Sequence, residues 1–140
     1  MSGQQIARLV EAGIAKVPHA VGLNNHMGSR FTQSGAGVDA VIAVLKQRRM
    51  FMLDSVTDPR SIFAREGQRL GIVSYKRNVF LDVTHSRKAV LDQLRQAERI
   101  ALLTGQSIAI GHPLPETLSA LEEWQRLRDP SVKIVRLQDL

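Results

Sequence analysis

The sequence predicts an α/β protein in which a mostly parallel sheet is flanked by helices. Amphipathic helical patterns alternate with short apolar runs along the whole chain, and those runs are too short to be helices. Strands that alternate with helices are typical of a parallel sheet covered by helices. With 140 residues, 44% of them hydrophobic, and no internal repeat, low-complexity segment or linker, the chain is expected to form a single domain over 1–140.

The first half of the chain is expected to hold three helices and two strands. In order, these are a helix at 4–16, a strand at 20–23, a helix at 38–49, a strand at 50–53 and a helix at 59–69. Ile6, Val10 and Ile14 recur at helical spacing, and Pro18 ends that first helix. Gly71 breaks the third helix.

The second half continues the alternation. It is expected to contain strands at 72–75 and 78–81, a helix at 86–103, a strand at 107–110, a helix at 115–127 and a last strand at 132–135. The long helix carries the apolar residues Ala89, Leu94 and Ala97 and ends before Gly105.

Composition excludes several classes of site. Cysteine is absent, which rules out disulfides and thiolate metal sites, and no apolar run reaches the roughly 18 residues of a membrane span. The N-terminal stretch resembles an amphipathic helix and shows no signal-peptide core. The net charge is +6, but the basic residues are scattered and only 4% of residues are aromatic, so nucleic-acid binding is not expected. The net positive charge is still compatible with a polyanionic ligand.

Polar residues follow the last apolar residue of four predicted strands. Asn24, Asn25 and His26 follow the first strand, Asp54 the second, Asp82 another, and His112 follows Gly111 after a fourth. In parallel α/β folds the carboxyl ends of the strands share one rim, so these side chains are expected to converge there.

Each of these residues also has a purely structural interpretation. His26 or His112 could only shape a turn, and no HxxxH or HExxH pair accompanies them. Asp54 could cap the helix that follows it, and Asp82 precedes two plausible caps, Thr84 and Ser86. The functional hypothesis rests on the occurrence of histidine, aspartate or asparagine after all four strands, and not on any one residue.

Four segments resemble a known family. They are VGLNNHMGSRFT at 21–32, FMLDSVTDPRS at 51–61, KRNVFLDVT at 76–84 and AIGHPLPETLSAL at 109–121. Together, and in this order, they resemble the divergent polysaccharide deacetylase family of the NodB-like carbohydrate deacetylase superfamily. The resemblance covers the whole chain but only about the later two-thirds of the family's domain.

The resemblance implies a partial, distorted (β/α) barrel and a divalent metal, usually zinc, held by an aspartate and two histidines. His26 matches one of the histidine ligands; the aspartate, from an Asp-Asp motif, and the other histidine match no segment here. His112 resembles the histidine that acts as an acid. Asp54 and Arg77 match polar positions that line or brace the pocket, and Asp54 or Asp82 could hold the imidazole in position.

The implied reaction is metal-assisted hydrolysis of N- or O-acetyl groups on glycans, which for an N-acetyl group breaks a carbon–nitrogen amide bond. The expected catalytic residues are His112, Asp54, Arg77 and Asp82. Asn24, Asn25 and Ser29 are expected to bind the glycan substrate. The resemblance also implies a periplasmic or cell-envelope location, and a homo-oligomer could cover the exposed edge of an incomplete barrel. The alternative is a non-catalytic glycan-binding or cell-envelope interaction module.

Overall fold

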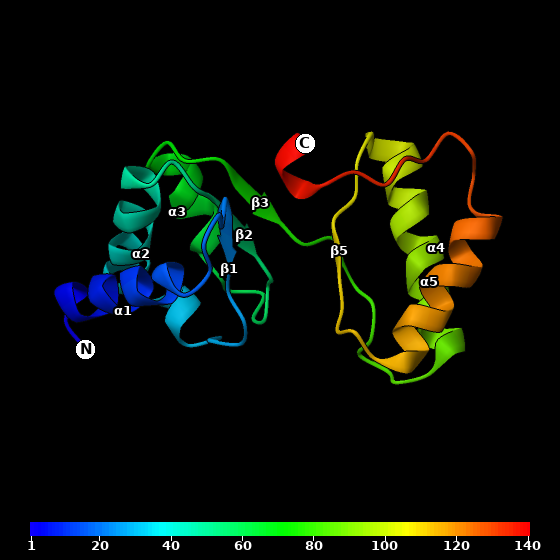
Figure 1. The fold of residues 1–140 in the computed structure, drawn as a ribbon, viewed down its shortest axis with the longest axis horizontal. Helices are drawn as coiled ribbons and strands as arrows, with labels where there is room; N and C mark the ends of the chain where they lie inside the picture. The colour runs from blue at the N-terminus through cyan, green and yellow to red at the C-terminus, as the bar shows by residue number, and fades with distance from the viewer. The chain divides into compact units, whose positions relative to one another are not determined.

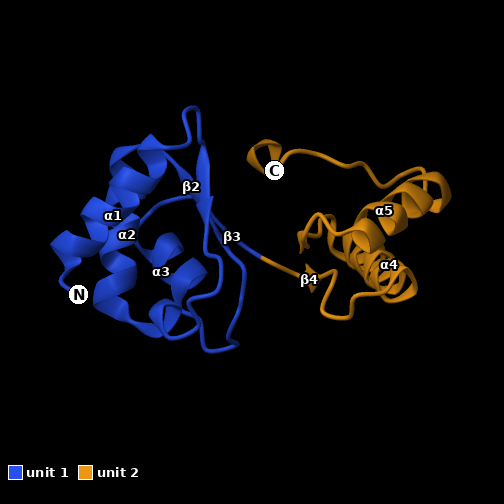
Figure 2. Ribbon diagram, turned by 60° about the horizontal axis from the view of Figure 1, so that its bottom comes forward, with its two compact units in different colours: residues 1–76 blue, residues 77–140 orange.

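The structure is a computed structural model that describes all 140 residues. The chain divides into two compact units, unit 1 at Met1–Lys76 and unit 2 at Arg77–Leu140, coloured separately in Figure 2. The expectation of a single domain over 1–140 stays a prediction.

Unit 1 is a three-stranded parallel sheet with helices on one face (Figure 1). Its elements are α1 (Gly3–Ala15), β1 (Gly22–Asn24), the 3₁₀ turn η1 (Phe31–Gln33), α2 (Gly35–Gln47), β2 (Phe51–Asp54), α3 (Phe63–Arg69) and β3 (Ser74–Lys76). The strand order is β1-β2-β3, with α2 and α3 connecting successive strands. Helical connections of this kind are what parallel neighbours require.

The core of unit 1 lies between β2 and the helices. Met52 and Val38 are fully buried, and Phe63 at the start of α3 is nearly so. A Cβ on Gly67 would lie 2.1 Å from Ser74 Oγ and 2.3 Å from Met52 Sδ, so α3 can approach the sheet only because this residue is glycine. Side chains alternate along a strand, so Asp54, two residues after Met52, also faces the helices.

Unit 2 repeats the same principle with two strands. Its elements are β4 (Val79–Phe80), α4 (Arg87–Thr104), β5 (Ala109–Ile110), α5 (Pro115–Leu127) and the short turn η2 (Leu137–Asp139). Strand β4 pairs in parallel with β5, and α4 is the connection between them. Gly105, at φ 91°, ends α4 in the left-handed conformation that glycine adopts without strain.

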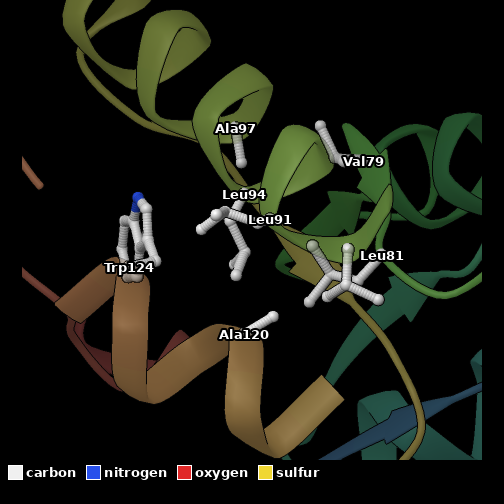
Figure 3. Packing of buried hydrophobic residues seen from close by; sticks show 8 residues of the cluster. Val79, Leu81, Leu91, Leu94, Ala97, Ala120 and Trp124 are labelled. Carbon is white, nitrogen blue, oxygen red and sulfur yellow. The ribbon is translucent and has the colours of Figure 1, made fainter. Parts of the chain in front are cut away.

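Leucine, valine and tryptophan side chains from β4, α4 and α5 form the core of unit 2 (Figure 3). Leu94 is 3% exposed and lies among them, and Ala120 brings α5 close to α4 because its side chain is small. Trp124 packs its ring into this core while its Nε1 donates to Glu98 Oε2 at 2.6 Å.

The predicted fold class is confirmed: the protein is α/β, with five α-helices and parallel strand pairs, and its strands do not form a closed barrel. The last predicted strand, 132–135, is wrong, because those residues pair with no strand. The Val132 carbonyl instead accepts a 2.6 Å hydrogen bond from Arg128 Nη1, and Ile134 and Val135 are exposed. A ladder needs a neighbouring strand to satisfy its backbone groups.

The third predicted helix starts later than expected. Residues 58–61 form a turn in which Asp58 Oδ1 accepts the Arg60 N–H, so α3 begins at Phe63. None of the helices combines the length and the apolar character that crossing a bilayer would require.

Candidate functional site

The turns after β1 and β2 are joined by asparagine side chains. Asn24 Nδ2 donates to Ser55 Oγ at 2.5 Å, and the Ser55 N–H donates to Asn25 Oδ1 at 2.8 Å. Asn25 also donates from Nδ2 to the Met27 carbonyl at 3.1 Å. Amide side chains both donate and accept, so two adjacent asparagines can fix two loops against each other.

His26 is an exposed residue of the turn that these bonds hold. Met27 and Gly28 follow it with φ of 57° and 79°, so the chain reverses sharply just after the imidazole. Ser29 Oγ donates to the Thr57 carbonyl at 3.3 Å and so ties this turn to the loop after β2. The turn holds His26 at the carboxyl end of the sheet, which is the position predicted from the sequence.

Asp54 is 1% exposed, and its carboxylate holds the loop that leads into α3. Oδ1 accepts the Val56 N–H at 2.8 Å, and Oδ2 accepts the Ser61 hydroxyl at 2.7 Å and the Ala64 N–H at 3.4 Å. These contacts match the structural alternative of a helix cap. They give Asp54 a positioning role, and its predicted catalytic role stays a prediction.

The loop that Asp54 holds contains a strained residue. Val56 has φ of 49°, a conformation that a β-branched side chain disfavours. Its N–H bond to Asp54 is one of the contacts that fix it there. Strain of this kind persists where the surrounding structure enforces it, and functional loops are a common place for it.

In unit 2, a buried carboxylate meets an exposed imidazole. The Asp82 side chain is fully buried, whereas the His112 side chain is 47% exposed. His112 Nδ1 lies 3.1 Å from Asp82 Oδ1 and 3.2 Å from Oδ2, and the His112 backbone N–H donates to Oδ2 at 2.5 Å. Thr117 in α5 donates to the same oxygen at 3.3 Å.

These contacts set the ionisation of Asp82. Burial by itself raises the pKa of this carboxyl, but the hydrogen bonds from the backbone and ring of His112 and from Thr117 outweigh it, so the pKa of Asp82 lies below its usual value. The carboxylate is therefore ionised at neutral pH. Because the carboxylate accepts the Nδ1 proton, it orients the imidazole, and Nε2 is the second ring nitrogen that can carry a proton.

An aromatic side chain lies next to the imidazole. The rings of Phe80 and His112 have centroids 5.8 Å apart at 57°, and the Arg77 guanidinium carbon lies 5.4 Å from the Phe80 ring centre. The structure thus links three side chains of unit 2 in a row. Arg77 was a predicted site residue, while Phe80 was not.

The predicted metal was tested against the donor set. No three His, Cys, Asp or Glu side chains are grouped as the ligands of a metal ion would be. His26 is a chemically suitable ligand, but zinc sites use three or four protein ligands, so the residues of this chain alone do not fit a complete zinc centre.

The structure brings the predicted residues together in two groups, one in each unit. The first group lies at the carboxyl ends of β1 and β2 and on the turn after β1, and its members are Asn24, Asn25, His26, Ser29 and Asp54. The second group lies around the ends of β4 and β5, and its members are Arg77, Asp82 and His112. The prediction that both groups share one mouth spans the two units and stays a prediction.

Sequence reasoning missed Ser55, Thr117 and Phe80, each of which contacts a predicted residue. The positions of two of them gave a signal, since Ser55 directly follows Asp54 and Phe80 lies two residues before Asp82. The position of Thr117 gave none, because its contact crosses from α5 to the loop after β4.

Comparison with known proteins places the chain in a family. The model of the divergent polysaccharide deacetylases matches residues 1–140, the entire chain. The chain belongs to this family.

Two curated relatives are named as uncharacterized proteins. The family member described here is 35% identical over all 140 residues to the uncharacterized protein YibQ of Escherichia coli K12, covering 44% of that protein. It is 31% identical to an uncharacterized protein of Haemophilus influenzae, covering 50% of it. The chain therefore spans about half the length of the curated relatives it matches.

A solved structure supports the fold. The crystal structure of an uncharacterized protein from Agrobacterium tumefaciens C58 is similar with a TM-score of 0.76 and 22% identity, over 84% of this chain and 50% of that one. At this identity, the likeness shows the fold alone.

Proposed function

We propose that this chain is part of a carbohydrate deacetylase-like hydrolase in which His112 transfers a proton to or from the reacting group. One observation carries the proposal: a fully buried, ionised Asp82 holds Nδ1 of an exposed imidazole. The proposed substrate class, an acetylated glycan, follows the description of the family, divergent polysaccharide deacetylase.

The geometry gives each atom of the pair a role. Asp82 accepts the Nδ1 proton, which fixes the tautomer and the plane of the ring. Nε2 then carries the mobile proton, and in the protonated ring it donates to the amine or alcohol that leaves the acetyl carbon. Whenever the ring takes up a second proton, the negative charge of Asp82 lies beside the positive charge.

The polar turns of unit 1 contain groups that suit a glycan. Asn24 uses its Nδ2 in the Ser55 contact, and its Oδ1 makes no protein hydrogen bond, which leaves an acceptor for a sugar hydroxyl. Ser29 retains acceptor capacity after donating to Thr57. A divalent metal, with zinc as the first candidate, belongs to the proposal by family resemblance alone, with His26 as the one ligand that this chain supplies.

Acetate release tests the proposal. The full gene product is incubated with acetylated oligosaccharides, and His112→Gln is expected to lower the rate by about 10²–10⁴, the usual contribution of a general acid. His85→Gln is the matched control, because His85 is an exposed histidine of the same unit. Equal rates for wild type and His112→Gln would refute the role of His112.

Two further outcomes separate the alternatives. Glycan binding that survives a chelator, with no acetate release at all, would support the non-catalytic module instead. Cell fractionation tests the proposed envelope location, and sedimentation of the purified chain tests the proposed self-association.

A further inference from the structure

A cavity of about 390 Å³ lies in unit 2 beside β4. Its walls are the residues of β4 with those on either side of the strand, the loop at Val83 and Thr84, and one stripe of α4 formed by Ala89, Gln93 and Gln96. The volume falls within the range of small-molecule sites. No carboxylate lines it, so the cavity does not suit a metal cation.

Its polar side chains have unused hydrogen-bonding capacity. The amides of Gln93 and Gln96 and the hydroxyl of Thr84 make no hydrogen bond within the protein. Asn78 is fixed because its Oδ1 accepts the Ile108 N–H at 2.8 Å, which leaves its Nδ2 to donate. These are neutral groups that can both donate and accept, as sugar hydroxyls do.

The cavity also has an aromatic and an open backbone edge. Phe80 lines it, and β4 pairs only with β5, so the other edge of the strand is unpaired at this residue. The Phe80 ring is also the one that contacts His112. The cavity therefore adjoins the candidate catalytic pair through a shared side chain.

We infer that this cavity is a subsite for a neutral pyranose unit of the glycan chain, next to the unit that His112 serves. The inference rests on the proposed function and extends it to a substrate of several sugar units. A ring with several hydroxyls matches three amides and one hydroxyl, and its apolar face matches Phe80. Arg77 is the one charged residue of the lining, and its guanidinium lies over the Phe80 ring. The other polar side chains of the lining are neutral, which favours a neutral ligand.

Oligosaccharide binding to the 140-residue chain tests the subsite. The probes are N-acetylglucosamine and its β-1,4-linked tetramer, and binding is followed by NMR shifts of backbone amides. The tetramer is expected to bind about 10-fold more tightly than the monomer, because one of its additional sugar units occupies the cavity. Its binding is also expected to shift the amide signals of residues 78–84. Gln93→Ala with Gln96→Ala should reduce tetramer affinity to that of the monomer.

Gln125→Ala is the matched control, because Gln125 is an exposed glutamine of α5 outside the cavity. The subsite is refuted if the tetramer shifts no signal at 78–84, or if the double variant binds it like wild type. Acetate assays separate the two proposals. Tetramer binding at the cavity without acetate release would leave the subsite standing and remove the hydrolase. If the double variant releases acetate as fast as wild type from oligosaccharides of every length, the hydrolase proposal would stand and the subsite would be refuted.

Discussion

Replacing Asp82 by asparagine tests the ionic account of the His112 loop. The carboxylate accepts three donors: the His112 backbone N–H, the His112 ring and the Thr117 hydroxyl. Asparagine offers one oxygen, so its NH₂ group must face at least one of these donors. Hydrogen bonds to a charged group contribute about 1.5–3 kcal/mol each, so we expect a loss of about 3 kcal/mol at neutral pH.

The pH dependence follows from the direction of the shift. The pKa of Asp82 is lowered in the folded state, so its stabilisation is complete above the unfolded value of about 4 and is lost as pH falls through the folded value. The difference between wild type and Asp82→Asn should therefore be largest at neutral pH and shrink in acid. Thermal unfolding measures it, with a shift of about 10 °C expected at pH 7 for about 3 kcal/mol.

Asp92→Asn is the control for this experiment, because Asp92 is an exposed carboxylate of the same unit. It should change unfolding little, since exposed ion pairs contribute little to stability. If the effect of Asp82→Asn is the same at about pH 3 as at pH 7, the loss comes from packing and the ionic account is refuted.

Three further substitutions probe the scaffold. Gly67→Ala forces a methyl group against Met52 and Ser74 and should cost about 1–3 kcal/mol in chemical denaturation; an unchanged midpoint would contradict the close approach of α3. Val56→Gly removes a strained left-handed valine, so unfolding should show no loss or a gain of up to about 1 kcal/mol, and a clear loss would mean that the side chain's packing outweighs the strain. Leu94→Ala empties part of the unit 2 core and should cost about 2–5 kcal/mol, whereas a cost below about 1 kcal/mol would show that this core is loosely packed.

The sequence was sufficient where local pattern decides structure. Short apolar runs between amphipathic segments located every strand that pairs, because burial in a parallel sheet demands such runs. The run at 132–135 has the same composition yet forms no strand, because pairing depends on a neighbour that composition does not reveal.

In the candidate site, too, contacts that follow from the strand pattern could be inferred, and contacts that depend on tertiary packing could not. That Asp82 and His112 lie close could be inferred, since both follow paired parallel strands, and the structure confirms that they meet. The Thr117 contact could not be inferred, because it depends on how α5 turns back after the loop. For Asp54, the sequence left a catalytic and a structural role open. In the structure, both of its carboxylate oxygens accept hydrogen bonds from Val56 and Ser61 in the following loop.

The central claim is that His112 handles the proton in acetyl-group hydrolysis, and the rate of acetate release measures it most directly. Wild type and His112→Gln are compared at matched folding, confirmed by circular dichroism, on the same acetylated oligosaccharide. The account predicts a fall of about 10²–10⁴ in kcat with KM little changed. A variant that retains the wild-type kcat would contradict it.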